Sequence, residues 1–114
     1  MRCNFLSFSP PLISEDEING VLETLQSGWI TTGPKTSSFE NEFKSFLRAR
    51  SALALNSCTG ALHTALASLG IGQGDEVVTT TMTFASTVNV IEHVGARPVL
   101  VDVEADTLNI NPQQ

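Results

Sequence analysis

The segment from Leu55 to Ala61 contains residue types that can bind an anion. Ser57 and Thr59 supply hydroxyl groups, and Gly60 lets a ligand approach the backbone closely. If this segment joins a strand to a helix, the first amides of the helix lack internal partners, and an anion is stabilised there. The alternative is that Ser57 or Thr59 simply caps the helix, as happens in many α/β proteins. Taken alone, the motif favours the cap over a phosphate site.

Phe84 is a second candidate, because it follows Thr81-Met82-Thr83 at another predicted turn between a strand and a helix. Both turns are expected at the same edge of a parallel sheet, where the Phe84 ring could cover a flat ligand whose phosphate is bound near Ser57. The alternative is that Phe84 packs in the core, as most phenylalanines do.

Cys58 suggests a different chemistry, a thiolate nucleophile at a helix N-terminus, although no base lies at a matching spacing.

Other residues with chemical potential fit structural roles better. His63 and His93 fall on separate predicted helices without cysteines or carboxylates at metal-ligand spacing, which favours surface positions and no metal site. The glycines over 70–74 follow a helix and precede a strand, the reverse of the order in a dinucleotide-binding fingerprint. They are expected to end a helix and form a turn.

Alternating helices and strands would position these groups. Ser14 and Glu17 form a capping box for a first helix that ends at Gly28, and a second helix is expected to open at Ser37. From residue 51 onward, strands are expected over 52–55, 76–80 and 98–103, and helices over 61–69 and 84–94. This order is typical of a parallel sheet with helical crossovers, so the predicted fold class is α/β.

The composition excludes several classes of protein. The 114 residues include 6 basic and 12 acidic side chains, and a net charge of −6 disfavours nucleic-acid binding. No apolar run approaches the roughly 20 residues of a membrane span, which argues against a membrane partner. Two cysteines are too few for a disulfide framework, which favours the cytoplasm. A chain of this length can bury roughly two-thirds of its unfolded surface, so a substantial core is expected.

Several motifs resemble one protein family when they are taken together. The stretches SGWITTGP at 27–34, NSCTGAL at 56–62 and GIGQGDEV at 70–77 resemble the DegT/DnrJ/EryC1/StrS family of pyridoxal-phosphate-dependent sugar aminotransferases. The match continues through residues 83–103 in order and spacing, and it covers essentially the whole chain.

The resemblance implies the start of the large domain of a type I pyridoxal-phosphate-dependent transferase, an aspartate-aminotransferase-like fold with three α/β/α layers. Residues 1–50 would form an N-terminal arm and two helices, and residues 51–114 a βαβαβ unit with the phosphate site. By resemblance, the cofactor phosphate is bound by Ser57, Cys58 and Thr59, and the pyridine ring stacks on Phe84. Sugar-nucleotide contacts are implied for Phe8, Gly28, Trp29, Ile30 and Thr31.

The implied activity is transfer of an amino group, with glutamate as the expected donor, to a nucleotide-linked keto-sugar in a homodimer. The only lysines, Lys35 and Lys44, precede the phosphate motif, whereas the family's Schiff-base lysine lies further along its members' chains. No catalytic residue is therefore assigned, and the chain alone is predicted to be inactive. The helix start expected at Asn111-Pro112 likewise indicates an N-terminal portion of a larger architecture.

Three alternatives remain open from the sequence. One is a non-catalytic phosphate-binding or regulatory module that has kept the phosphate motif. Another is a structural remnant that needs a partner, because the apolar stripe of the second helix requires a facing surface; its residues are Phe39, Phe43, Phe46 and Leu47. The third is a sugar dehydratase of the same family, in which histidine replaces the lysine.

Overall fold

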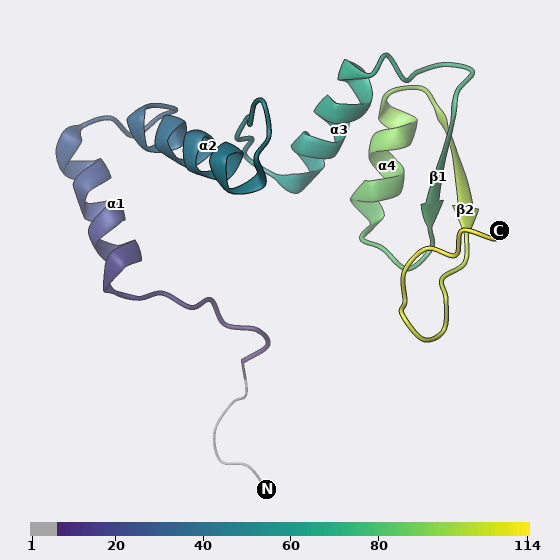
Figure 1. The fold of residues 1–114 in the computed structure, drawn as a ribbon, viewed down its shortest axis with the longest axis horizontal. Helices are drawn as coiled ribbons and strands as arrows, with labels where there is room; N and C mark the ends of the chain where they lie inside the picture. The colour runs from purple at the N-terminus through teal and green to yellow at the C-terminus, as the bar shows by residue number, and fades with distance from the viewer. Residues whose placement is uncertain (1–6) are drawn as a thin grey trace, which may run out of the picture. The chain divides into compact units, whose positions relative to one another are not determined.

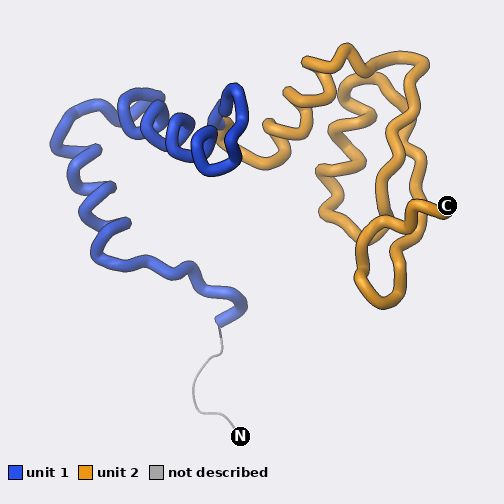
Figure 2. The backbone as a smooth tube through the Cα atoms, viewed as in Figure 1, with its two compact units in different colours: residues 1–54 blue, residues 55–114 orange. Residues whose placement is uncertain are grey.

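The computed structural model describes residues 7–114, which belong to two compact units that divide between Ala54 and Leu55 (Figure 2). The elements run in the order α1 (Glu15–Ser27), α2 (Pro34–Leu47), α3 (Cys58–Ser68), β1 (Glu76–Thr80), α4 (Ala85–His93) and β2 (Arg97–Val101) (Figure 1). Helices alternate with parallel strands from α3 onward, which confirms the predicted α/β class.

Helix α1 has the predicted signals at both ends. Ser14 Oγ accepts from the Asp16 amide at 3.3 Å, and the Glu17 carboxylate accepts from the Ser14 amide at 2.6 Å. The Ser14 hydroxyl also donates to the Glu17 carboxylate. This hydrogen bond, followed by the one from the Ser14 amide, holds the pKa of Glu17 below its ordinary value. Gly28 ends the helix at a φ of 70°, and its N–H donates to the Leu25 carbonyl.

The predicted start of α2 at Ser37 is wrong by one turn. The helix begins at Pro34, and the Ser37 amide donates to the Gly33 carbonyl at 3.0 Å. Proline suits the first helical position because its φ is already helical and its missing N–H would have no partner there. Glu40 therefore lies inside the helix, where its carboxylate accepts from the Ala54 amide at 2.9 Å.

The apolar faces of α1 and α2 remain exposed, and neither helix has a buried residue. On α2 the Phe39 and Phe43 rings lie 5.7 Å apart, and Phe46 is 84% exposed. The expectation of a substantial core is therefore wrong for this unit. The reason is that the described residues place no further apolar element against these faces.

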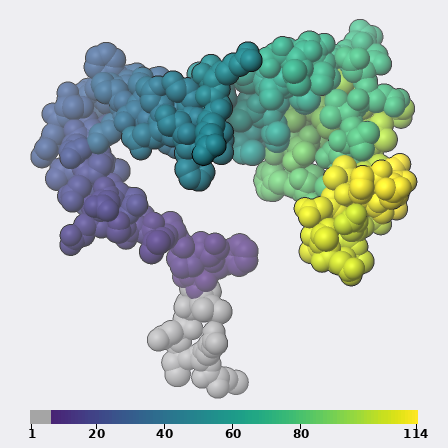
Figure 3. All heavy atoms as spheres, in the orientation of Figure 1, coloured from purple at the N-terminus to yellow at the C-terminus, as the bar shows by residue number. Residues whose placement is uncertain are grey.

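The second unit has a small core around the β1–α4–β2 crossover. The strands pair in parallel, from Glu76 beside Arg97 to Thr80 beside Val101, and the first pair also forms an ion pair. Val90 and Ile91 of α4 are 1% and 2% exposed, and α4 packs on both strands. Helix α3 packs beside α4, and their atoms form one continuous surface in the space-filling view (Figure 3).

The predicted strand over 52–55 is not a strand in the structure. A strand exists only where a neighbour completes its ladder of hydrogen bonds, and the described residues bring none beside this segment. The Ala54 amide instead donates to the Glu40 side chain. The sheet formed by the described residues therefore has two strands rather than the predicted three.

Strand β2 ends before the predicted residue 103, and the chain then turns. Val103 forms an isolated antiparallel bridge with Ile110. The helix predicted at Asn111-Pro112 is absent from residues 7–114, although Asn111 Oδ1 accepts from the Gln113 amide at 2.9 Å, as a helix cap would. Among these same residues, no helix is both long and apolar enough to cross a membrane.

Candidate functional site

The turn before α3 combines a helix cap with unpaired hydrogen-bond donors. The helix begins at Cys58, three residues before the predicted Ala61, and Ser57 is its N-cap. Ser57 Oγ accepts from the Gly60 amide at 3.0 Å, so the capping interpretation is confirmed. The Ser57 hydroxyl proton has only a distant acceptor, Asn56 Oδ1 at 3.5 Å.

These donors fit a phosphate group. The backbone N–H groups of Cys58 and Thr59 begin the helix, and the described residues provide no acceptor for either. The positive end of the helix dipole favours an anion, and the exposed Thr59 hydroxyl can donate to the same ligand. A Cβ at Gly60 would lie 3.2 Å from Asn56 Oδ1 and 3.3 Å from Ser57 Oγ, so glycine leaves room for the cap.

Phe84 does not pack in the core, because 80% of its surface is exposed. It occupies the N-cap position of α4 without a capping side chain, and its carbonyl accepts from the Thr87 amide at 2.9 Å. The Thr83 and Thr87 hydroxyls are 2.9 Å apart and hydrogen-bond to each other. The core alternative for Phe84 is therefore wrong, and a large aromatic face stays free for contact.

The two turns lie at the same end of the second unit. The N-termini of α3 and α4 both lie towards the carboxyl ends of β1 and β2 (Figure 1). This is the end of a parallel sheet at which α/β proteins bind ligands. The structure thus places the Ser57–Thr59 turn and Phe84 on the same side of the unit, as the sequence predicts.

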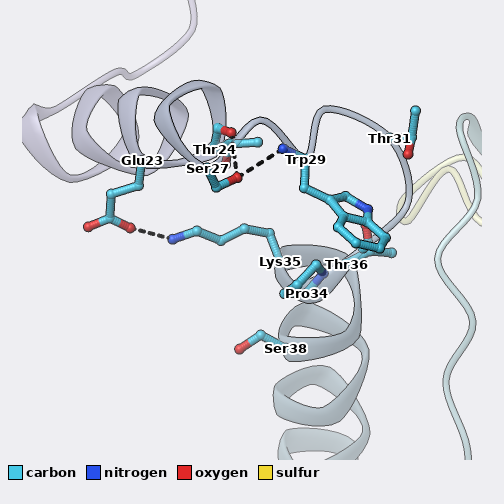
Figure 4. A pocket seen from close by; sticks show the side chains of 10 residues that line it. Glu23, Thr24, Ser27, Trp29, Thr31, Pro34, Lys35, Thr36 and Ser38 are labelled. Carbon is cyan, nitrogen blue, oxygen red and sulfur yellow. Dashed lines mark hydrogen bonds and ion pairs between the residues drawn. The ribbon is translucent and has the colours of Figure 1, made fainter.

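A cavity of about 540 Å³ lies in the first unit, between the end of α1 and the start of α2 (Figure 4). Of the five residues predicted to contact a sugar nucleotide, Trp29 and Thr31 line it. Gly28, Ile30 and Phe8 do not, and Phe8 is 99% exposed. The remaining lining residues are Glu23, Thr24, Ser27, Gly33, Pro34, Lys35, Thr36 and Ser38.

An ion pair joins the two helices beside this cavity. Lys35 Nζ lies 2.6 Å from Glu23 Oε2, and both side chains are exposed (Figure 4). The hydrogen bond from Lys35, together with its positive charge, holds the pKa of Glu23 below its ordinary value. The sequence interpretation missed this pair because only the turn between the helices brings the two residues together.

The structure also brings together two histidines that lie on separate helices. The rings of His63 on α3 and His93 on α4 have centroids 6.1 Å apart. No group of three His, Cys, Asp or Glu side chains able to hold a metal ion occurs within residues 7–114. Only the packing of α3 on α4 brings the rings close, and no spacing in the sequence signals it.

Comparisons with known proteins match nearly all of the chain to part of longer relatives. The model of the DegT/DnrJ/EryC1/StrS aminotransferase family matches residues 11–114. The spore coat polysaccharide biosynthesis protein SpsC of Bacillus subtilis is 54% identical over 111 residues, which is 97% of this chain and 28% of SpsC. The chain therefore spans less than a third of the length of this relative.

Solved structures give the same result. The PMP form of Spr1654 from Streptococcus pneumoniae, assigned as a sugar aminotransferase, superposes with a TM-score of 0.86 at 47% identity, covering 93% of this chain and 27% of that one. An aminotransferase from Psychrobacter cryohalolentis has a TM-score of 0.85 at 37% identity, covering 94% and 28%. The fold is that of pyridoxal-phosphate-dependent aminotransferases, and the chain belongs to the DegT/DnrJ/EryC1/StrS aminotransferase family.

Proposed function

We propose that this chain is the N-terminal portion of a pyridoxal-phosphate-dependent aminotransferase that moves an amino group from glutamate to a nucleotide-linked keto-sugar. The observation that carries this proposal is the turn before α3, where unpaired donors gather at a helix N-terminus in a member of this family. A PLP form of Spr1654 is among the structures that the chain matches.

The turn before α3 would bind the cofactor phosphate. The Ser57 and Thr59 hydroxyls and the backbone amides of Cys58 and Thr59 are donors without a close acceptor among the described residues. The oxygens of a phosphate group would accept hydrogen bonds from all of these donors, and the helix dipole would stabilise the negative charge of the phosphate. Cys58 contributes through its backbone in this arrangement, which assigns no reaction to its exposed thiol.

Phe84 would cover the cofactor ring. Its exposure supports this role, and so does its place at the start of α4, whose N-terminus lies at the same end of the unit as that of α3. Pyridoxal phosphate supplies an electron sink when it is bound. The residues described here would bind and orient that group, and none of them is assigned a catalytic role.

Neither lysine of the chain has the surroundings of a catalytic amine. Lys35 is paired with Glu23, and Lys44 Nζ donates to Asn41 Oδ1 at 3.0 Å on the exposed surface of α2. Activity would therefore need residues beyond this chain. We propose that the complete enzyme is a cytoplasmic homodimer, in keeping with its family and with the acidic, cysteine-poor sequence.

The loop from Gly28 to Thr31, together with Phe8, would contact the sugar nucleotide. The cavity lined by Trp29 and Thr31 supports this part of the proposal, since it offers an aromatic ring and several hydroxyl groups. These are groups that can stack on a base and donate hydrogen bonds to a sugar or phosphate.

A chimera can test the proposal without knowledge of the sugar. In this aminotransferase chimera, the chain replaces the matching N-terminal part of Spr1654, to which it is 47% identical. The chimera is expected to bind pyridoxal phosphate, and added glutamate is expected to change the absorbance spectrum from that of the PLP form to that of the PMP form. The chain alone is expected to give no such change.

Two outcomes of this experiment would contradict the proposal. One is a chimera that unfolds as cooperatively as Spr1654 but binds no pyridoxal phosphate. The other is amino transfer by the chain alone.

A non-catalytic phosphate-binding module remains a second candidate, because the donors of the α3 turn do not depend on a catalytic lysine. Calorimetry of the chain alone with inorganic phosphate and with pyridoxal phosphate separates the two. The module predicts saturable binding of both ligands by the isolated chain. The absence of such binding would remove it.

A further inference from the structure

The indole of Trp29 fills the space beside Gly33. A Cβ added at Gly33 would overlap the indole Nε1 and Cδ1 atoms, and it would lie only 2.9 Å from Cε2. The indole can move aside only by giving up its present position, because real Cβ atoms do not approach so closely. Residue 33 must therefore be glycine for Trp29 to lie where it does.

The backbone gives no other reason for a glycine at this position. Gly33 has a φ of −167°, an extended conformation that any residue adopts. Gly28 differs, because its φ of 70° lies in the left-handed region that favours glycine. Gly33 is also the N-cap of α2, where glycine is preferred over alanine, but the steric requirement comes from the indole of Trp29, which makes it separable by mutation.

Hydrogen bonds hold Trp29 at both ends. The indole Nε1 donates to the Thr32 carbonyl at 2.9 Å, and the Trp29 amide donates to Ser27 Oγ at 3.1 Å. The Ser27 hydroxyl in turn donates to the Thr24 carbonyl at 2.7 Å in the last turns of α1. Trp29 therefore links the end of α1 to Thr32, the residue that precedes Gly33. The Ser27 side of this link is visible in Figure 4.

The residues between these anchors are left free. Ile30 is 71% exposed, and Thr31 is also exposed. We propose that Trp29 and Gly33 form a latch that fixes the loop so that Ile30 and Thr31 can contact the sugar nucleotide. Trp29 then positions the loop in addition to the contact proposed above for its exposed ring, and this inference rests on the proposed function of the loop.

Fluorescence tests the latch directly, because the chain contains a single tryptophan. Gly33→Ala is expected to displace the indole and to raise its quenching by acrylamide. The upper bound is about 1.8-fold, the ratio of full exposure to the 56% exposure of the Trp29 residue. Gly20→Ala is the control and should leave the quenching unchanged. Equal quenching in the Gly33→Ala and wild-type chains would overturn the latch.

The positioning role is tested in the aminotransferase chimera with UDP- and dTDP-linked keto-sugars. Gly33→Ala is expected to raise KM for the keto-sugar by about 10-fold, the effect of losing one or two loop contacts. The glutamate half-reaction should keep its rate. In a Trp29→Ala background, Gly33→Ala should have no further effect, because the overlap is gone.

Different outcomes would contradict the positioning role of Trp29 and the proposed function of the chain. A changed fluorescence with an unchanged KM would overturn the positioning role. A KM effect of Gly33→Ala that persists in the Trp29→Ala background would overturn it as well. Failure of the chimera to bind pyridoxal phosphate would instead contradict the proposed function, since that step does not use the latch.

Discussion

Ser57 Oγ accepts the hydrogen bond of the Gly60 amide at 3.0 Å, and this contact uses only a lone pair of the hydroxyl oxygen. The hydroxyl proton is left with a 3.5 Å contact to Asn56. The cap and the phosphate site, which the sequence presents as alternatives, are therefore compatible in one side chain. The oxygen caps the helix, while the proton remains free for an anion.

Variants of Ser57 should separate these two roles. Ser57→Ala removes the cap and is expected to lower the free energy of unfolding by about 1 kcal/mol. Ser57→Asp keeps an acceptor for the Gly60 amide and should stay close to the wild type in stability. Its negative charge should nevertheless weaken the binding of pyridoxal phosphate more than Ser57→Ala does.

Urea unfolding of the aminotransferase chimera gives the free energy of unfolding, and titration of the same chimera with pyridoxal phosphate gives the cofactor affinity. Thr59→Val is a useful companion variant, because it removes a hydroxyl without removing the cap. A Ser57→Asp chimera that binds the cofactor as tightly as the parent would show that the phosphate does not lie at this turn.

Phe84 provides a test in which stability and binding should diverge. Because the ring is 80% exposed, Phe84→Ala should change the free energy of unfolding by no more than about 0.5 kcal/mol. Cofactor affinity should fall roughly 2- to 12-fold, which corresponds to the 0.5–1.5 kcal/mol of an aromatic pair. Phe84→Tyr should keep the affinity. A large loss of stability with unchanged affinity would contradict the ring-stacking role.

The ion pair of Glu23 and Lys35 predicts a dependence of stability on pH. The pKa of Glu23 is lowered from 4.5 in the folded chain, so its carboxylate stabilises the fold fully above pH 4.5. This contribution is lost as the pH falls through the lowered pKa. Urea unfolding of the chain between pH 7 and pH 3 should show the loss, and Glu23→Gln should reduce it.

Lys35→Gln should reduce the same acid-dependent loss, since the hydrogen bond and charge that lower the pKa come from Lys35. The part of the pH dependence that comes from the Glu17 capping box should persist in both variants. An unchanged pH profile in Glu23→Gln would mean that the pair does not form in solution.

Features set by neighbouring residues could be predicted from the sequence. Three such features depend on residues within a few positions of one another: the capping box of Ser14 and Glu17, the helix end at Gly28 and the strand over 76–80. Such local signals work because the hydrogen bonds they form do not need the rest of the fold. The resemblance of several motifs to one family predicted the aminotransferase fold, which local signals alone could not predict.

Features that depend on distant partners, on the orientation of a side chain or on a choice between two local signals were missed or wrong. The apolar run 52–55 has the composition of a buried strand, yet it pairs with nothing because no described strand lies beside it. The contact between Trp29 and Gly33 depends on the orientation of one ring, which no pattern of residue types specifies. The start of α2 was misplaced because Ser37 also has the composition of a cap, whereas Pro34 determines the start.

The small core of the second unit predicts that side-chain size is a poor guide to stability in this chain. Ile91 is 2% exposed between α4 and the strands, so Ile91→Ala should lower the free energy of unfolding by about 2–5 kcal/mol. Phe46→Ala removes a larger side chain, but its ring is 84% exposed, and the change should stay within about 0.5 kcal/mol. Urea unfolding of both variants measures the difference. A greater loss from Phe46→Ala would mean that the apolar face of α2 is covered in solution. The cover would be a second copy of the chain or another segment of the first unit. A urea midpoint that depends on protein concentration would identify the second copy.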